Sequence, residues 1–307
     1  MSRGGSGPVC ARLGSGRWHF QHGPIDLILA VEGETHEGEH AIAACWDRFQ
    51  TVLPGLVAEL AQLRRPAHER PSVRDPVATR MVQACAPFAA ERFVTPMAAV
   101  AGAVADELIE TFKRAGIRRA FINNGGDIAL HLTPGEQYRV GVWSNLARVR
   151  SSDDPGRAVD SRFVVDAGMP VRGIATSGWR GRSFSLGIAD SVTVLADTAA
   201  AADAAATLIA NAVDCDFAGI MRVPAQQLKD DTDLGSLPVT MDVPPLPPEA
   251  IEAALACGRT EAEYWRERGI IHAAALFLQG QVEVVLPLTA GSLPRPLPRV
   301  SFERIVA

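Results

Sequence analysis

The sequence predicts an α+β fold in which long helices pack on a mixed, mainly antiparallel sheet. Apolar runs of strand length come in groups, rather than in strict alternation with helices. Long segments with helical periodicity separate these groups, and two of them begin at an Asp-Pro or Thr-Pro pair, a typical helix start. Near the C-terminal end, two apolar runs flank a Gln-Gly pair and predict a closing hairpin.

The first elements show both kinds of pattern. Ile25–Val31 is apolar throughout and is expected to form a buried strand. Glu39–Leu63 has helical periodicity, but Pro54 lacks an amide hydrogen and should kink or split this helix. Asp75 is a good N-cap for a further helix, because Pro76 follows it at the first helical position.

The middle and the end of the chain alternate between small-residue helices and short strands. Thr95-Pro96 opens a helix over Met97–Ala115 that should stop at Gly116. Residues 224–248 are polar and proline-rich and predict a long excursion. Further helices are expected at Ala199–Val213 and Glu249–Arg268, and strands at Arg118–Ile122, Ile128–Leu132, Gln137–Trp143, Ser161–Asp166, Val171–Ala175, Asp190–Ala196, Ile270–Leu278 and Val282–Leu286.

Composition indicates an ordinary globular protein. The 307 residues include 30 basic and 35 acidic side chains, which gives a net charge of −5 and argues against nucleic-acid or membrane-surface binding. No run approaches the length of a membrane span, and residues 1–16, rich in Gly and Ser, lack the apolar core of a signal peptide. We therefore expect a cytoplasmic protein with a disordered segment at 1–16 and a single domain over 17–307.

The first candidate binding element is Asn123-Asn-Gly-Gly-Asp127. Asn-Gly is a strong hairpin signal, so the segment can be an ordinary turn. Alternatively, the two glycines let backbone amides approach an anionic ligand closely, and Asp127 can accept a hydrogen bond from a ligand hydroxyl or ring N–H.

A second candidate element ends an apolar strand at Thr176-Ser-Gly178. Small hydroxyl residues at a strand end can bind phosphate oxygens, although they also form ordinary turns. Arg180 and Arg182 follow and are natural partners for phosphate, or simply surface charges.

The third candidate element is a carboxylate and a hydroxyl on one helix face. Asp203 and Thr207 are four residues apart and offer hard oxygen ligands of the kind that Mg²⁺ prefers. Alternatively, Asp203 only complements the helix dipole and Thr207 bonds a backbone carbonyl.

Other catalytic motifs carry less weight. His36-Glu-Gly-Glu-His40 fits the H-E-x-x-H pattern of zinc proteases, but Gly38 should weaken the required helix and the segment is expected in a polar turn. We interpret this fit as accidental. The sequence contains no G-x-S-x-G, no Walker A segment and no G-x-G-x-x-G after a strand.

Taken in order, these segments resemble the UPF0280 family of the ApbE-like superfamily, from about Trp18 to Pro287. The best-known members of this superfamily are flavin transferases. The landmarks that carry the resemblance are Thr95-Pro-Met-Ala-Ala-Val-Ala-Gly102, Asn123-Asn-Gly-Gly-Asp-Ile128, Gly173-Ile-Ala-Thr-Ser-Gly178, Ala189-Asp-Ser-Val-Thr-Val194 and Ala202-Asp-Ala-Ala-Ala-Thr-Leu-Ile-Ala-Asn211.

The resemblance implies a fold, a ligand and a set of site residues. Flavin transferases bind FAD, use Mg²⁺ and move an FMN group onto a threonine of an acceptor protein. The metal ligands implied here are Asp203 and Thr207. The implied cofactor-binding residues are Gly102, Asp106, Asn124, Gly125, Gly126, Asp127, Thr176, Ser177, Gly178 and Ser183.

Two departures from the family pattern affect the expected chemistry. The Lys and the aromatic residue of one transferase helix are here Ala101 and Ala103. The segment with the transferase histidine is replaced by the shorter Ser183–Asp190, which leaves Asp190 as the candidate base. Three functions stay open: an FAD-dependent transferase or diphosphate-cleaving enzyme, a non-catalytic flavin or pterin binder, and a biosynthetic enzyme for a one-carbon carrier pterin.

Overall fold

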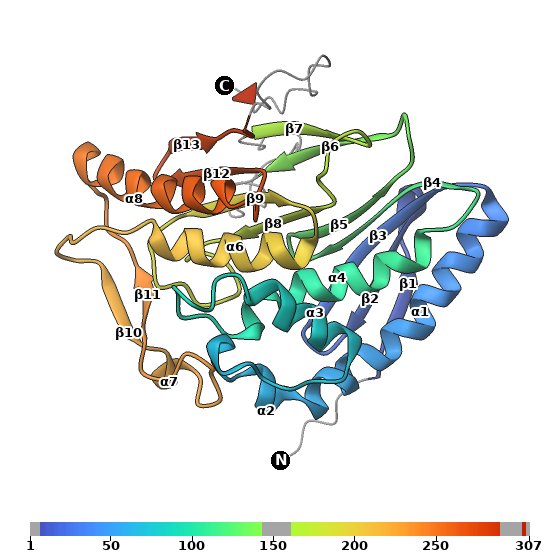
Figure 1. The fold of residues 1–307 in the computed structure, drawn as a ribbon, viewed down its shortest axis with the longest axis horizontal. Helices are drawn as coiled ribbons and strands as arrows, with labels where there is room; N and C mark the ends of the chain where they lie inside the picture. The colour runs from blue at the N-terminus through green and yellow to red at the C-terminus, as the bar shows by residue number, and fades with distance from the viewer. Residues whose placement is uncertain (1–6, 143–160, 289–302, 305–307) are drawn as a thin grey trace. The chain divides into compact units, whose positions relative to one another are not determined.

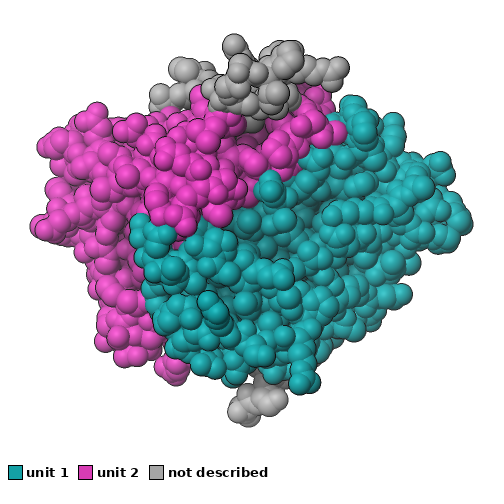
Figure 2. Space-filling model, viewed as in Figure 1, with its two compact units in different colours: residues 1–136, 172–175, 197–204 teal, residues 137–171, 176–196, 205–307 magenta. Residues whose placement is uncertain are grey.

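The structure, a computed structural model, describes residues 7–142, 161–288 and 303–304 (Figure 1). It contains two compact units, coloured separately in Figure 2. Unit 1 comprises residues 1–136, 172–175 and 197–204, and unit 2 comprises residues 137–171, 176–196 and 205–307. The chain therefore passes between the units several times, and no single cut along the sequence separates them.

Unit 1 is built on an antiparallel sheet. Its strands are β1 (Val9–Arg12), β2 (Arg17–His22), β3 (Ile25–Gly33), β4 (Ile117–Asn124) and β5 (Asp127–Leu132), hydrogen-bonded in that order and followed by the first residues of β8 (Gly173–Ser177). The β4–β5 register pairs Asn124 with Asp127, so the candidate glycine turn joins these two strands.

Part of the amino-terminal segment forms regular structure, although the sequence predicted that residues 1–16 are disordered. Val9–Arg12 forms β1, which pairs along its whole length with β2. Composition misses this strand because its backbone hydrogen bonds, and not burial of its side chains, hold it in place. Residues 1–6 lie outside the described residues.

The helices of unit 1 are α1 (Thr35–Ala58), α2 (Leu60–Leu63), α3 (Pro76–Cys85) and α4 (Val100–Ile109). Asp75 caps α3 as predicted, because its Oδ1 accepts the amide hydrogen of Val77 at 2.8 Å. Helix α1 runs through Pro54, and the break predicted there comes instead at Glu59. Helix α1 contacts β3, and α4 contacts β4 and β5, so both helices cover the sheet (Figure 1).

Unit 2 contains the remaining strands. The end of β8, then β9 (Ser191–Ala196), β12 (Ala273–Leu278) and β13 (Gln281–Val285) lie side by side, with β12 antiparallel to both of its neighbours. In a separate three-stranded sheet, β7 (Ser161–Asp166) lies between β6 (Gln137–Val142) and β14 (Glu303–Arg304) and pairs with both. A further two-stranded ribbon pairs β10 (Met221–Pro224) with β11 (Pro238–Asp242). The predicted hairpin turn is confirmed, since Gln279 and Gly280 both have positive φ.

The helices of unit 2 include α7 (Ala225–Leu228) and α8 (Pro248–Glu267), which contacts β12 and β13. Helix α6 (Ala199–Ala212) starts in unit 1 and continues in unit 2. Among the described residues, every strand pair with a defined register is antiparallel, which confirms the predicted α+β class. None of the described helices combines the length and the apolar character needed to cross a bilayer.

Candidate metal and cofactor site

Two helices of unit 1, α4 and α6, begin at a point where the backbone is closely packed. A β-carbon on Gly102 would collide with the carbonyl group of Ala199, and one on Gly173 would collide with the carbonyl group of Thr198. Both positions therefore need glycine for space rather than for an unusual φ. The landmark glycines of the family resemblance serve here to bring the start of α6 against α4 and β8.

Each of these helices is capped by a carboxylate from the other. The Asp106 side chain on α4 accepts the amide hydrogens of Ala199 at 2.9 Å and Ala200 at 2.8 Å. In return, Oδ2 of Asp203 on α6 accepts the amide hydrogen of Gly102 at 3.0 Å. Amides in the first turn of a helix have no acceptor within it, and the helix dipole attracts negative charge there. The exchange thus stabilises both helix starts.

The two oxygens of Asp106 are occupied by these backbone amides, and the residue is buried at 7% exposure. Burial raises the pKa of Asp106 to about 6, although the hydrogen bonds from the backbone amides of Ala200 and Ala199 oppose the shift. The sequence assigned Asp106 to the cofactor; its contacts in the structure are those of a helix cap.

The Asp106 shift predicts a pH dependence of stability. Because the pKa rises from 3.8 to about 6 on folding, the native state binds the proton more tightly. The contribution of Asp106 to the free energy of unfolding is therefore fully present below about pH 4 and is lost as the pH rises through 6. Its size is about 3 kcal/mol. We expect Asp106→Asn to flatten this part of the curve in urea unfolding measured from pH 4 to 7 without metal. An unchanged pH profile in the variant would contradict the assignment.

The glycine turn of β4 and β5 lies against the start of α4. Asn123 Oδ1 accepts the amide hydrogen of Gly126 at 2.8 Å, and Gly125 and Gly126 have φ of 71° and 121°. The Asn124 side chain donates to the carbonyl oxygen of Ala101 at 3.1 Å. Asn123, which the sequence did not assign to the site, thus fixes the turn, and Asn124 ties it to α4.

This turn brings Asp127 near Asp203. Asp127 is buried at 8% exposure, and Asp203 is partly buried. Burial raises the pKa of Asp203 well above its usual value, and the negative charge of Asp127 raises it further. The hydrogen bonds from the backbone amides of Gly102 and Ala101 oppose this rise in the pKa. Two neighbouring carboxylates that repel each other are suited to a divalent cation that prefers hard oxygen ligands.

Thr207 lies four residues after Asp203 on α6, in the part of the helix that belongs to unit 2. Because the helix is continuous, the two residues share a helix face, as the sequence predicted. The side chain of Thr207 is partly buried.

In unit 2, the Thr-Ser-Gly element ends β8 as predicted. Thr176 Oγ1 lies 2.9 Å from Thr193 Oγ1 on β9, a pairing that the sequence analysis did not anticipate. A β-carbon on Gly178 would collide with the carbonyl oxygen of Asp190. Ser177 is partly buried and Ser183 is exposed.

Asp190, the candidate base, is held by two donors in unit 2. Its Oδ1 accepts a hydrogen bond from Arg180 Nε at 2.9 Å, and its Oδ2 accepts one from the backbone amide of Gln279 at 2.6 Å. Gln279 has a left-handed backbone, and its side chain amide donates to the carbonyl oxygen of Pro244 at 2.7 Å. Asp190 therefore anchors the β12–β13 turn in addition to any role with a ligand.

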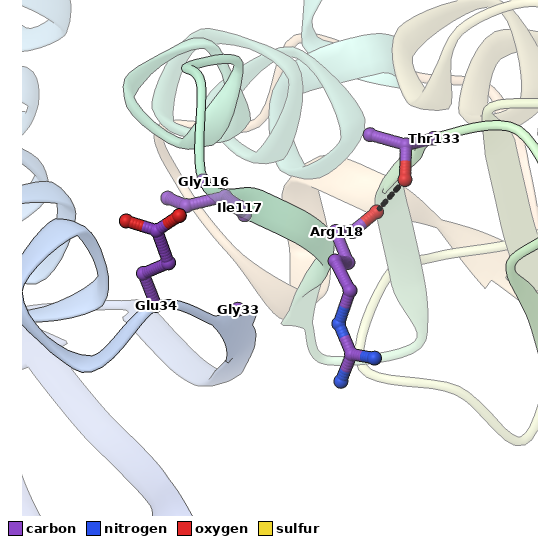
Figure 3. A pocket seen from close by; sticks show the side chains of 6 residues that line it. All are labelled: Gly33, Glu34, Gly116, Ile117, Arg118 and Thr133. Atoms are coloured by element: carbon purple, nitrogen blue, oxygen red, sulfur yellow. Dashed lines mark hydrogen bonds between the residues drawn. The ribbon is translucent and has the colours of Figure 1, made fainter.

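An open cavity of about 390 Å³ lies elsewhere in unit 1 (Figure 3). Its lining residues are Gly33, Glu34, Gly116, Ile117, Arg118 and Thr133. Ile117 and Asn124 are the two ends of β4, so this cavity and the glycine turn are separated by the length of the strand, roughly 20 Å at 3.3 Å per residue. The cavity is thus distinct from the aspartate site.

Asp127 and Asp203 both lie in segments that carry the family resemblance, and the comparison with known families tests that resemblance. A model of the family described as AbpE bacteria matches residues 10–284. The chain belongs to this family. The predicted relationship to the UPF0280 and ApbE-like proteins is confirmed.

Several related proteins are named UPF0280 proteins. A UPF0280 protein of Methanoculleus marisnigri is 37% identical over 43% of this chain and 51% of its own length. UPF0280 proteins of Methanosarcina barkeri and Methanosarcina acetivorans are 32% and 28% identical, over 50% and 64% of this chain and over 55% and 72% of their own lengths. The chain thus spans about half the length of the first two of these UPF0280 proteins.

Two solved structures are also similar. The ApbE protein of Thermotoga maritima is 12% identical with a TM-score of 0.43, over 90% of this chain and 96% of that one. The apo form of the flavinyl transferase ApbE of Pseudomonas stutzeri is 14% identical with a TM-score of 0.37, over 93% and 96%.

Proposed function

We propose that this AbpE-family chain binds a flavin nucleotide of the FAD or FMN type together with Mg²⁺, and that it transfers or cleaves at the diphosphate. The observation that supports the proposal most directly is the pair of aspartates in unit 1, Asp203 and Asp127, at the amide-rich start of α4. Family membership supports the same ligand class, since one similar structure is named as a flavinyl transferase.

In this proposal, Asp203 and Thr207 hold the metal and Asp127 adds negative charge beside it. When bound, Mg²⁺ would neutralise charge on the diphosphate and on the group that leaves. Gly125 has no side chain and is exposed, so a flat ligand can approach the backbone of the turn closely. Gly102 and Asp106 contribute indirectly. The amide of Gly102 on α4 donates to the Asp203 carboxylate, and Asp106 caps the start of α6, the helix that carries Asp203.

The remaining predicted ligand residues belong to unit 2. We assign Thr176, Ser177, Gly178 and Ser183 to the nucleotide through their hydroxyl and backbone groups. In the transfer, an acceptor hydroxyl oxygen forms a bond to the FMN phosphorus, the bond from that phosphorus to the AMP oxygen breaks, and the hydroxyl proton passes to a base. Water in place of the acceptor would give FMN and AMP.

Asp190 is the proposed base, and we expect Asp190→Asn to lower turnover of FAD by roughly 10²–10⁴-fold, the usual worth of general-base help. Release of AMP at saturating FAD and Mg²⁺ measures this effect. Arg180→Gln is the matched control: it removes the ion pair with Asp190 and leaves the carboxylate in place. Asp190→Asn with wild-type turnover would exclude Asp190 as the base.

The proposal as a whole is tested by incubating the full chain with FAD and Mg²⁺. We expect release of AMP, together with free FMN or a flavin-labelled acceptor protein. A protein that binds flavin without any release of AMP would instead support a non-catalytic binder. That second candidate is favoured by the two donors on Asp190, since both of its carboxylate oxygens are already engaged in hydrogen bonds within the protein.

A further inference from the structure

Three metal-ligating side chains come together on the first turns of α1, away from the aspartate site. The side chains are those of His36, Glu37 and His40, and one ligand atom from each lies within 4.8 Å of the other two. The rings of His36 and His40 have centroids 4.0 Å apart. The two histidines are exposed and Glu37 is partly buried, so a metal ion can reach all three from solvent.

The local fold explains why this segment is ordered. The sequence predicted a polar turn weakened by Gly38, but α1 begins at Thr35 and includes the whole H-E-x-x-H segment. Gly38 is buried, and a β-carbon on it would lie 3.5 Å from Val31 Cγ1 on β3. The glycine is thus a packing residue between α1 and the sheet. Because residues i and i+4 share a helix face, the two imidazoles are brought together by the helix itself.

Two acidic side chains and one arginine lie beside the two histidines. Glu37 Oε1 lies 3.8 Å from His36 Nδ1. Glu37 Oε2 forms an ion pair with Arg114 Nε at 2.9 Å, and this ion pair restrains the carboxylate. Glu34 and Glu37 both lie beside Gly116, since a β-carbon there would be 3.1 Å from an atom of each, and Figure 3 shows Glu34 next to this glycine. Both acidic side chains offset the positive end of the helix dipole, which would otherwise disfavour a metal ion at this position.

We propose that His36, His40 and Glu37 form a binding site for a divalent transition-metal ion such as Zn²⁺ or Ni²⁺. Imidazole suits these ions, whereas Mg²⁺ prefers oxygen ligands, so the site differs in metal class from the aspartate site. The site adjoins the open cavity, since Glu34 and Gly116 line the cavity and Gly116 also contacts Glu37. The ion pair of Glu37 with Arg114 argues against the protease role in which this glutamate acts as a base.

The test is calorimetric titration of the chelator-treated full chain with Zn²⁺ and, separately, with Ni²⁺. We expect saturable binding of the metal ion to the wild type. The affinity should fall by at least about 10-fold in His36→Ala and in His40→Ala, because removing even an outer-shell partner of a metal ligand has an effect of this size. Alanine is the strongest helix former, so neither change should disturb α1. His68→Ala, at another exposed histidine, should bind as the wild type does.

Asp203→Ala should also keep wild-type Zn²⁺ affinity, which separates this site from the proposed flavin site. Equal affinity in the wild type and in His40→Ala would overturn the proposal. So would a wild-type chain that binds neither Zn²⁺ nor Ni²⁺. Circular dichroism of the variants establishes that helix content is unchanged when affinity is compared.

Discussion

Asp203→Ala is expected to abolish the Mg²⁺-dependent binding of FAD. The change removes a proposed metal ligand from α6, and the lost affinity should be roughly 100-fold or more, since even outer-shell partners of a metal are worth 10–100-fold. Titration of the protein with FAD at saturating Mg²⁺, followed by flavin fluorescence, measures the effect. The same titration in a chelator should give weak binding for both proteins.

Two further variants separate loss of the ligand site from loss of the fold. Asp203→Asn keeps the shape of the side chain and one acceptor for the amide of Gly102, while it removes the repulsion by Asp127. In a chelator it should therefore unfold at the wild-type temperature or above, yet show no rise in Tm with Mg²⁺. Asp47→Ala, at an exposed carboxylate of α1, is the matched control and should bind FAD normally. If Asp203→Ala bound FAD with wild-type affinity, the assignment of Asp203 to the metal site would be wrong.

Gly173→Ala is expected to destabilise the fold by about 3 kcal/mol or more, because overpacking typically costs 1–3 kcal/mol even where flexible side chains can yield. Here the added methyl group meets the carbonyl group of Thr198 and the amide of Ala199, which are backbone atoms at the start of α6. Gly102→Ala should behave alike, since its methyl group meets the backbone of Ala199 and Ala200. Urea unfolding, or loss of the folded fraction, measures both effects.

The matched control is Gly14→Ala, where a β-carbon would have no neighbour within 4 Å and φ is not left-handed. This variant should unfold within about 0.5 kcal/mol of the wild type, as surface changes usually do. If Gly173→Ala were as stable as Gly14→Ala, the close approach of α6 to β8 would be wrong.

The sequence predicted the elements whose signals are local. Asp75 with Pro76 marks the start of α3, and the helix at 199–213 and the strand at 190–196 match α6 and β9 within about a residue. The failures come from tertiary context. Pro54 does not split α1, because burial of Phe49, Val52 and Leu56 on that helix outweighs one missing hydrogen bond.

The site shows a similar division. The sequence assigned Asp106, Asp127 and Asp203 to the site, because their neighbours resembled those of the family's site residues. It could not show that Asp106 and Asp203 cap each other's helices, since the two residues lie far apart along the chain. The sequence placed Asn123 in the candidate turn but not its hydrogen bond, although an Asn three residues before the amide it binds is a local signal. The contact of Thr193 with Thr176 was missed, because it depends on strand pairing alone.

The central claim is that the paired aspartates hold a metal on which flavin binding depends, and native mass spectrometry of the full chain tests it most directly. With FAD and Mg²⁺ present, we expect a complex whose added mass equals FAD plus a metal ion, and we expect that complex to disappear in a chelator and in Asp203→Ala. FAD retained without metal, or an equal yield of the complex from Asp203→Ala, would contradict the claim.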